Sequence, residues 1–128
     1  MLKFLVGFIL IVQPLPAFSA ESDWISVGTT EDREFFLDRS SVRDTASGTK
    51  EAWLKQVLRQ GPDFIQIKEI LLKTEFDCSA RRLRIVQGTA IFRDGRRDTR
   101  SDALPWDEAS DASASGGKQL NLVCFGRI

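Results

Sequence analysis

The chain has 128 residues with 18 basic and 18 acidic side chains, so its formal net charge of zero favours no class of partner. It contains no histidine, which excludes Ser-His-Asp and Cys-His catalysis and removes histidine as a metal ligand. Gly116-Gly117-Lys118 lacks the spacing of a phosphate-binding loop.

The first nineteen residues have the pattern of a signal peptide. Lys3 supplies a positive charge, residues 4–12 are almost purely apolar, and Ala17-Phe18-Ser19 supplies small residues at a signal peptidase site. We predict cleavage directly after this triplet, with cleavage after Ala20 as the alternative. The apolar run is shorter than the roughly 20 residues that span a bilayer, although an uncleaved membrane anchor remains the alternative interpretation. No cysteine near the cleavage site would carry a lipid anchor. We therefore predict one exported domain over residues 20–128, without stable membrane insertion, in the periplasm or on the outer cell surface.

The two cysteines, Cys78 and Cys124, are predicted to form a disulfide because export places them in an oxidising compartment. The bond would close a loop of roughly 47 residues and stabilise the fold by at most about 4 kcal/mol in the chain-entropy model. Two free thiols, or a disulfide between molecules, are the alternatives.

Short apolar stretches bounded by turn residues predict strands in the first half of the domain. The stretches are 24–28, 35–38 and 50–58, although the apolar spacing in the last one also fits a helix. Ser47-Gly48 predicts a chain reversal, and residues 60–63 predict the end of the third strand.

Strict alternation makes residues 64–78 the clearest strand. Apolar or small side chains occupy one face and charged side chains the other. The first face carries Ile70, Leu72, Thr74, Phe76 and Cys78, and the second carries Lys73, Glu75 and Asp77. The opposite parity of Ile65 and Ile67 predicts a bulge near Lys68-Glu69. Cys78 is therefore expected to point toward the core.

After a turn at residues 79–81, residues 82–92 are predicted to run back as the next strand of an antiparallel meander. Asp94-Gly95 predicts a two-residue hairpin turn with both residues at positive φ. Residues 107–117 are small and polar and predict a loop, whereas residues 120–124 fit a helix or a strand equally well.

Several short motifs with aromatic, acidic or cysteine residues follow one another along the predicted mature chain. They are Trp24, residues 35–42, Gly48 ahead of Trp53, residues 73–78 followed by Arg81 and Arg84, Trp106, and residues 122–124. With these motifs the chain resembles the surface-adhesin protein E family of exported Gram-negative proteins over nearly its whole mature part. The resemblance implies an α+β fold, in which a small curved antiparallel sheet carries a short C-terminal helix, residues 113–124, on one face. The disulfide would tie that helix to the sheet, which needs such a cover for its apolar face.

Seven arginines between residues 81 and 100, against only Asp94 and Asp98, give this segment a local charge of +5. They are Arg81, Arg82, Arg84, Arg93, Arg96, Arg97 and Arg100. The planar guanidinium suits sulfate, phosphate and carboxylate, so we interpret them as a candidate patch for sulfated glycans, lipopolysaccharide or acidic stretches of host proteins. The alternative is a solvated strand face that pairs with Glu69, Glu75 and Asp77.

The remaining chemistry is sparse. Carboxylate pairs such as Glu75 with Asp77, or Asp107 with Glu108, resemble a glycosidase acid and base, but 18 acidic residues produce such pairs by chance. The mature chain offers no haem ligand once the cysteines are paired, so no cofactor or metal is expected. Nucleic acid is not an expected partner, because aromatic side chains do not alternate with the arginines.

The tryptophans, Trp24, Trp53 and Trp106, are expected to pack in the core or between sheet and helix rather than to form a ligand platform. We predict a non-enzymatic exported binding protein, and the resemblance implies adhesin-like attachment to host macromolecules. The alternative is a periplasmic envelope module that binds a partner protein or a small apolar ligand without meeting a host.

Overall fold

A computed structural model describes residues 21–59, 66–109 and 116–126. The predicted signal peptide, the predicted stop at residues 60–63 and the start of the strand predicted from residue 64 lie outside these ranges. Most of the polar loop predicted over residues 107–117 also falls outside them.

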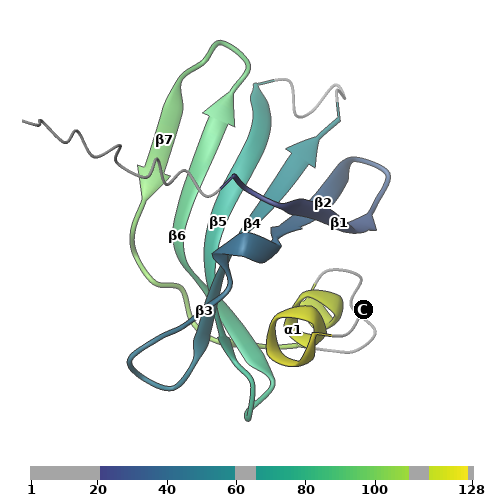
Figure 1. Cartoon of the computed structure of the whole chain (residues 1–128). Helices are drawn as coiled ribbons and strands as arrows, with labels where there is room; N and C mark the ends of the chain where they lie inside the picture. Colours follow the sequence, from purple (N-terminus) through teal and green to yellow (C-terminus); the bar gives the residue numbers. More distant parts are fainter. Residues whose placement is uncertain (1–20, 60–65, 110–115, 127–128) are drawn as a thin grey trace, which may run out of the picture.

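The fold is a curved antiparallel sheet with one short helix, as predicted (Figure 1). Its elements are β1 (Trp24–Thr29), β2 (Arg33–Asp38), the 3₁₀ turn η1 (Arg39–Ser41), β3 (Arg43–Asp44), β4 (Lys50–Leu58), β5 (Ile67–Asp77), β6 (Arg82–Phe92), β7 (Arg97–Arg100), β8 (Asp107–Glu108) and α1 (Gly116–Phe125). The strand order is β1-β2-β4-β5-β6-β7, while β3 pairs with β4 and β8 with β6. The ambiguous segment 50–58 is therefore a strand, and it lies between β2 and β5 in the sheet.

The core lies on the sheet face that α1 covers. Leu37, Leu54 and Leu72 occupy paired positions on β2, β4 and β5, so their side chains share this face. The buried cluster consists of Val27, Leu37, Ala52, Leu54, Phe76, Leu120 and Val123. We call this the inner face of the sheet and the opposite one the outer face.

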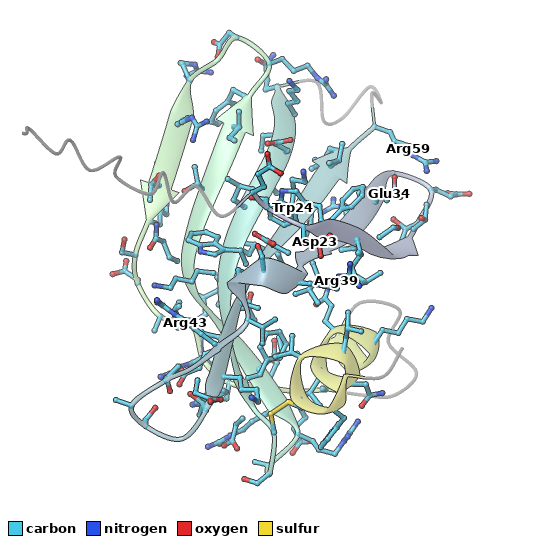
Figure 2. The ribbon with its side chains drawn as sticks, in the orientation of Figure 1. Asp23, Trp24, Glu34, Arg39, Arg43 and Arg59 are labelled. Atoms are coloured by element: carbon cyan, nitrogen blue, oxygen red, sulfur yellow. A yellow bond between two sulfur atoms is a disulfide. The ribbon has the colours of Figure 1, made fainter. Side chains whose placement is uncertain are left out.

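The helix depends on its contacts with the sheet more than on its own sequence. It opens with Gly116 and Gly117, and glycine costs a helix interior about 1 kcal/mol relative to alanine. Leu120 and Val123, spaced by three residues, are buried against the sheet. The predicted disulfide between Cys78 and Cys124 joins the end of β5 to the last turn of α1, with the two Cα atoms 5.6 Å apart, and appears as the yellow bond in Figure 2.

Two details at this end of the fold differ from the expected loop. Asp107 and Glu108 form β8 and pair with Leu83 and Arg82 of β6. The two glycines at 116 and 117 belong to α1, because a buried helix face can hold residues that local composition assigns to a loop.

The long strands carry two bulges. The register of β5 against β6 shifts between Ile67 and Glu69, which confirms the bulge predicted near Lys68. A second shift, opposite Lys73 and Thr74, leaves Val86 of β6 without a partner and was not predicted.

The hairpin between β6 and β7 has a three-residue turn, so the predicted two-residue turn is wrong. The Phe92 amide donates to the Arg96 carbonyl, and the Gly95 amide donates to the Phe92 carbonyl, both at 2.9 Å. Gly95 has a φ of 93°, but Asp94 does not reach positive φ. Instead, the Asp94 carboxylate accepts a hydrogen bond of 3.0 Å from the Arg96 amide, which fixes the longer turn.

Candidate functional site

The seven predicted arginines do not gather at one place. Arg81, Arg82 and Arg84 lie at the start of β6, near α1, whereas Arg93, Arg96, Arg97 and Arg100 belong to the β6–β7 hairpin. At about 3.3 Å per residue, Arg84 and the hairpin turn are roughly 25 Å apart. Two separate groups must therefore be considered, which we call the helix-end arginines and the hairpin arginines.

The helix-end arginines are engaged within the protein. Arg82 pairs with Asp77 at 3.1 Å and Arg84 pairs with Glu75 at 2.8 Å. Their guanidinium carbons also lie 4.6 and 4.4 Å from the ring centroid of Trp106. For these two arginines the structure matches the ion-paired interpretation, and this arrangement stabilises the end of the sheet beside α1.

Arg81 has its own contact with the helix. Its side chain donates to the side-chain Oδ1 atom of Asn121 on α1 at 3.4 Å, and its φ of 52° closes the turn between β5 and β6. The three helix-end arginines therefore connect the sheet, the helix and the segment that carries Trp106.

Glu75 is buried, although the alternation of β5 predicts an exposed face for it. Only 8% of Glu75 is exposed, and its carboxylate accepts hydrogen bonds from Thr49 at 2.6 Å and Arg84 at 2.8 Å. Burial raises the pKa of Glu75, but these hydrogen bonds and the charge of Arg84 outweigh it and lower the pKa below its ordinary value of 4.5. Thr49, just before β4, and Arg84 of β6 hold the carboxylate from both sides, which the sequence of β5 alone does not reveal.

The hairpin arginines are exposed. Arg96 pairs with Asp94 at 2.8 Å, Arg100 contacts Asp98 only at 3.7 Å, and Arg97 forms no ion pair within the described ranges. Exposed pairs of this kind contribute little to stability, so these guanidinium groups remain accessible to an external anion.

Two further cations lie beside the hairpin turn. The Arg93 side chain donates to the Leu58 carbonyl at 3.4 Å, which places the turn next to Arg59 at the end of β4. The Arg93 amide donates to the Gln66 carbonyl at 2.8 Å, which brings in exposed Lys68 at the start of β5. In Figure 2, Arg59 lies at this end of the sheet, opposite α1. We call Arg59, Lys68 and the hairpin arginines the basic end. Sequence reasoning missed Arg59 and Lys68 because only strand pairing brings them to the hairpin.

Trp24 and Trp53 lie on the outer face of the sheet, so the expectation that they pack in the core or between sheet and helix is wrong for these two. Trp53 follows Ala52 and precedes Leu54, which both point inward, and therefore lies on the outer face. Trp24 pairs with Asp38, which follows inward-pointing Leu37, and so lies on the same face. The strict alternation of small or aliphatic residues with Trp53 was the signal that could have revealed this.

Among the hollows in the described part of the chain, two lie on opposite faces of the sheet. A cleft of about 250 Å³ on the outer face is lined by Ser22, Trp24, Asp38, Trp53 and Leu71. A hollow of about 260 Å³ on the inner face, beyond α1, has an apolar floor on β5 and β6. Its lining includes Ile70, Leu72, Ile85, Ala90 and Leu104, and Leu104 is 50% exposed.

Within the described residues, no three cysteine or acidic side chains gather in a way that would hold a metal ion. Of the acidic pairs found in the sequence, Glu75 and Asp77 are each engaged by an arginine. The helix in the described part of the chain is too short and too polar to cross a membrane.

Comparison with known proteins returns no relative: no family model, curated protein or solved structure matches this chain.

Proposed function

We propose that the protein is an exported, non-enzymatic binding module that attaches to anionic polymers through its basic end. The observation that supports this is the gathering of exposed guanidinium groups on one hairpin, joined by Arg59 and Lys68 from neighbouring strands. Arginine binds sulfate, phosphate and carboxylate in bidentate geometry, and a cluster of cations raises the local concentration of a polyanion.

The ligands that fit this surface are sulfated glycans, lipopolysaccharide and acidic stretches of host proteins. The resemblance of the sequence to surface-adhesin protein E favours the host-attachment role among these. Because the cations lie on the surface, we expect binding to weaken as salt concentration rises.

A second candidate is a periplasmic envelope module that binds a partner protein or a small apolar ligand. The inner-face hollow favours it, since aliphatic side chains line about 260 Å³ that α1 leaves uncovered. Gly88 lies on its floor, where an added Cβ would meet Leu72 only at an ordinary contact distance of 3.5 Å. Gly88→Leu would fill the hollow and abolish binding of an apolar probe, such as 1-anilinonaphthalene-8-sulfonate, if this candidate is correct.

Charge reversal at the basic end tests the first proposal. In Arg96→Glu with Arg97→Glu, affinity for heparin at about 0.1 M salt should fall at least tenfold, because two attractive contacts become repulsive. The matched control reverses Arg39 and Arg43, whose exposed side chains lie away from the hairpin (Figure 2). Heparin affinity that is equal in the two double variants would refute the proposal.

The site of exposure in the cell separates the two candidates. Protease added to intact cells should cleave a surface adhesin, whereas a periplasmic module is protected until the outer membrane is opened. Full protection would contradict the attachment role and leave the periplasmic candidate.

A further inference from the structure

The outer-face cleft is built by three neighbouring strands. Trp24 of β1 pairs with Asp38 of β2, and the pairing of Leu37 with Leu54 brings Trp53 of β4 beside the same aspartate. The two indoles therefore stand on either side of Asp38, and both line the cleft of about 250 Å³.

The distance between Trp24 and Trp53, with Asp38 between them, fits one ring of a ligand. Adjacent strands lie about 4.8 Å apart, so the backbones that carry the two tryptophans are separated by roughly 10 Å. A ring stacked between two indoles needs two contact distances of about 3.5–4 Å each. The separation therefore leaves room for one layer, a single ring stacked between the two indoles.

The floor of the cleft is held in place. The Asp38 Oδ1 atom accepts hydrogen bonds from the Asp23 amide at 2.8 Å, the Ser40 amide at 3.0 Å and the Ser40 hydroxyl at 2.6 Å. The Ser41 hydroxyl donates to the Asp38 carbonyl at 2.7 Å and accepts from the Trp53 amide at 2.8 Å. These bonds fix the aspartate and the backbone of one tryptophan relative to each other, so the cleft is formed before any ligand arrives.

Lys55 supplies a cation beside the cleft, whose own lining carries one charged side chain, that of Asp38. Its ammonium lies 4.3 Å from the ring centroid of Trp24 and 5.2 Å from that of Phe36, and it faces Leu71 across β4 and β5. In the described part of the chain no carboxylate lies within ion-pair distance of it. An acidic group that reaches the Lys55 ammonium would be attracted, while the Asp38 carboxylate on the floor accepts hydrogen bonds from the ligand's hydroxyl groups rather than its acidic group.

We propose that this cleft binds one acidic sugar ring, a uronic acid or a sulfated sugar, stacked between Trp24 and Trp53 with its acidic group toward Lys55. The apolar C–H faces of a sugar ring pack on indole, and its hydroxyl groups find polar partners at the Asp38 floor and Ser22. The cleft shares no residue with the basic end, so this site goes beyond the polymer attachment proposed above.

Tryptophan fluorescence and calorimetry provide the test. In a Trp106→Phe background only the two cleft tryptophans remain as reporters, and a chondroitin sulfate disaccharide should quench them. By titration calorimetry, Trp24→Ala and Trp53→Ala should each lower its affinity at least tenfold, and Trp106→Ala, the matched control, should not. Lys55→Gln should lower the affinity for the chondroitin sulfate disaccharide several-fold. The weak affinity for lactose, a neutral disaccharide, should not change. Trp53→Leu keeps an apolar side chain on the sheet and replaces Trp53→Ala in this test if the alanine variant does not fold.

Two results would overturn the proposal. Tetramethylammonium that binds more tightly than the acidic disaccharide would make the cleft a cation site. Disaccharide affinity that survives both tryptophan variants but is lost in Arg96→Glu with Arg97→Glu would place the sugar at the basic end. If both sites exist, the double variant should lose at least tenfold in heparin affinity and keep its full disaccharide affinity. Heparin affinity equal to that of the Arg39 and Arg43 control, with disaccharide binding intact, would refute only the polymer proposal.

Discussion

Arginines lie at both ends of β6, but the two groups differ in their exposure to solvent. At the helix end, Arg82 and Arg84 are held by Asp77 and Glu75 and stack on Trp106. At the other end, the hairpin arginines are exposed, and Arg97 has no ion-pair partner in the described ranges. An arginine count therefore does not measure binding capacity, because three of the seven arginines in this segment are engaged by the fold itself.

The same contrast applies to the covalent and apolar contacts. The disulfide, the buried face of α1 and the buried carboxylate of Glu75 all lie at the helix end. We therefore expect substitutions there to change stability, and substitutions at the basic end to change binding. The predictions below separate the two ends.

The largest effect is expected from the disulfide. Cys78→Ala with Cys124→Ala should lower the free energy of unfolding by up to about 4 kcal/mol, because the unfolded chain regains the freedom that the closed loop removed. Urea denaturation measures the loss. The double variant that remains folded should bind heparin with an affinity within twofold of that of the natural protein. A loss of stability below about 1 kcal/mol would instead show that packing alone holds α1 on the sheet.

A smaller loss is expected from the buried ion pair. Arg84→Ala leaves the Glu75 carboxylate with only its Thr49 partner and should cost about 1–3 kcal/mol. Adding Glu75→Gln should recover part of this loss, since the unpaired charge is then removed. Arg97→Ala at the exposed hairpin is the matched control and should change stability by less than about 0.5 kcal/mol. Equal losses in both arginine variants would contradict the distinction between the two ends.

The pH dependence of stability reports the same carboxylate. Because the pKa of Glu75 is lower in the folded than in the unfolded protein, the unfolded chain binds more protons in acid. The stabilisation is therefore complete above the ordinary glutamate pKa of 4.5 and is lost as the pH falls through the folded value. Urea denaturation between about pH 2 and pH 6 should show a flatter dependence for Glu75→Gln than for the natural protein, and identical slopes would contradict this.

Local alternation predicted the strands well, and long-range pairing explains most of what was missed. The pattern of residues 70–78 predicted a strand with Cys78 turned toward the core, because a two-residue period is visible within one segment. The covered carboxylate of Glu75 required knowing that Thr49, just before β4, and Arg84 of β6 flank it. Its burial could not be derived from the sequence of its own strand.

The candidate sites show the same limit. The hairpin arginines were found from composition, but Arg59 and Lys68 join them only through the pairing of β4, β5 and β6. Likewise, hydrophobicity alone assigned Trp24 and Trp53 to the core. Alternation with Ala52 and Leu54 could have turned Trp53 outward, but the register of β1, β2 and β4 is needed to bring Trp24 to the same face with Asp38 between the two.

The most direct test of the central claim, that anionic polymer binds at the exposed end of β6, is a map of the contact. A heparin oligosaccharide titrated into ¹⁵N-labelled protein should shift the amide signals of residues 59, 66–68 and 92–97 most strongly. The amides of residues 82–84 at the helix end should shift little. Shifts concentrated at residues 82–84 instead, or spread evenly over the sheet, would contradict the account.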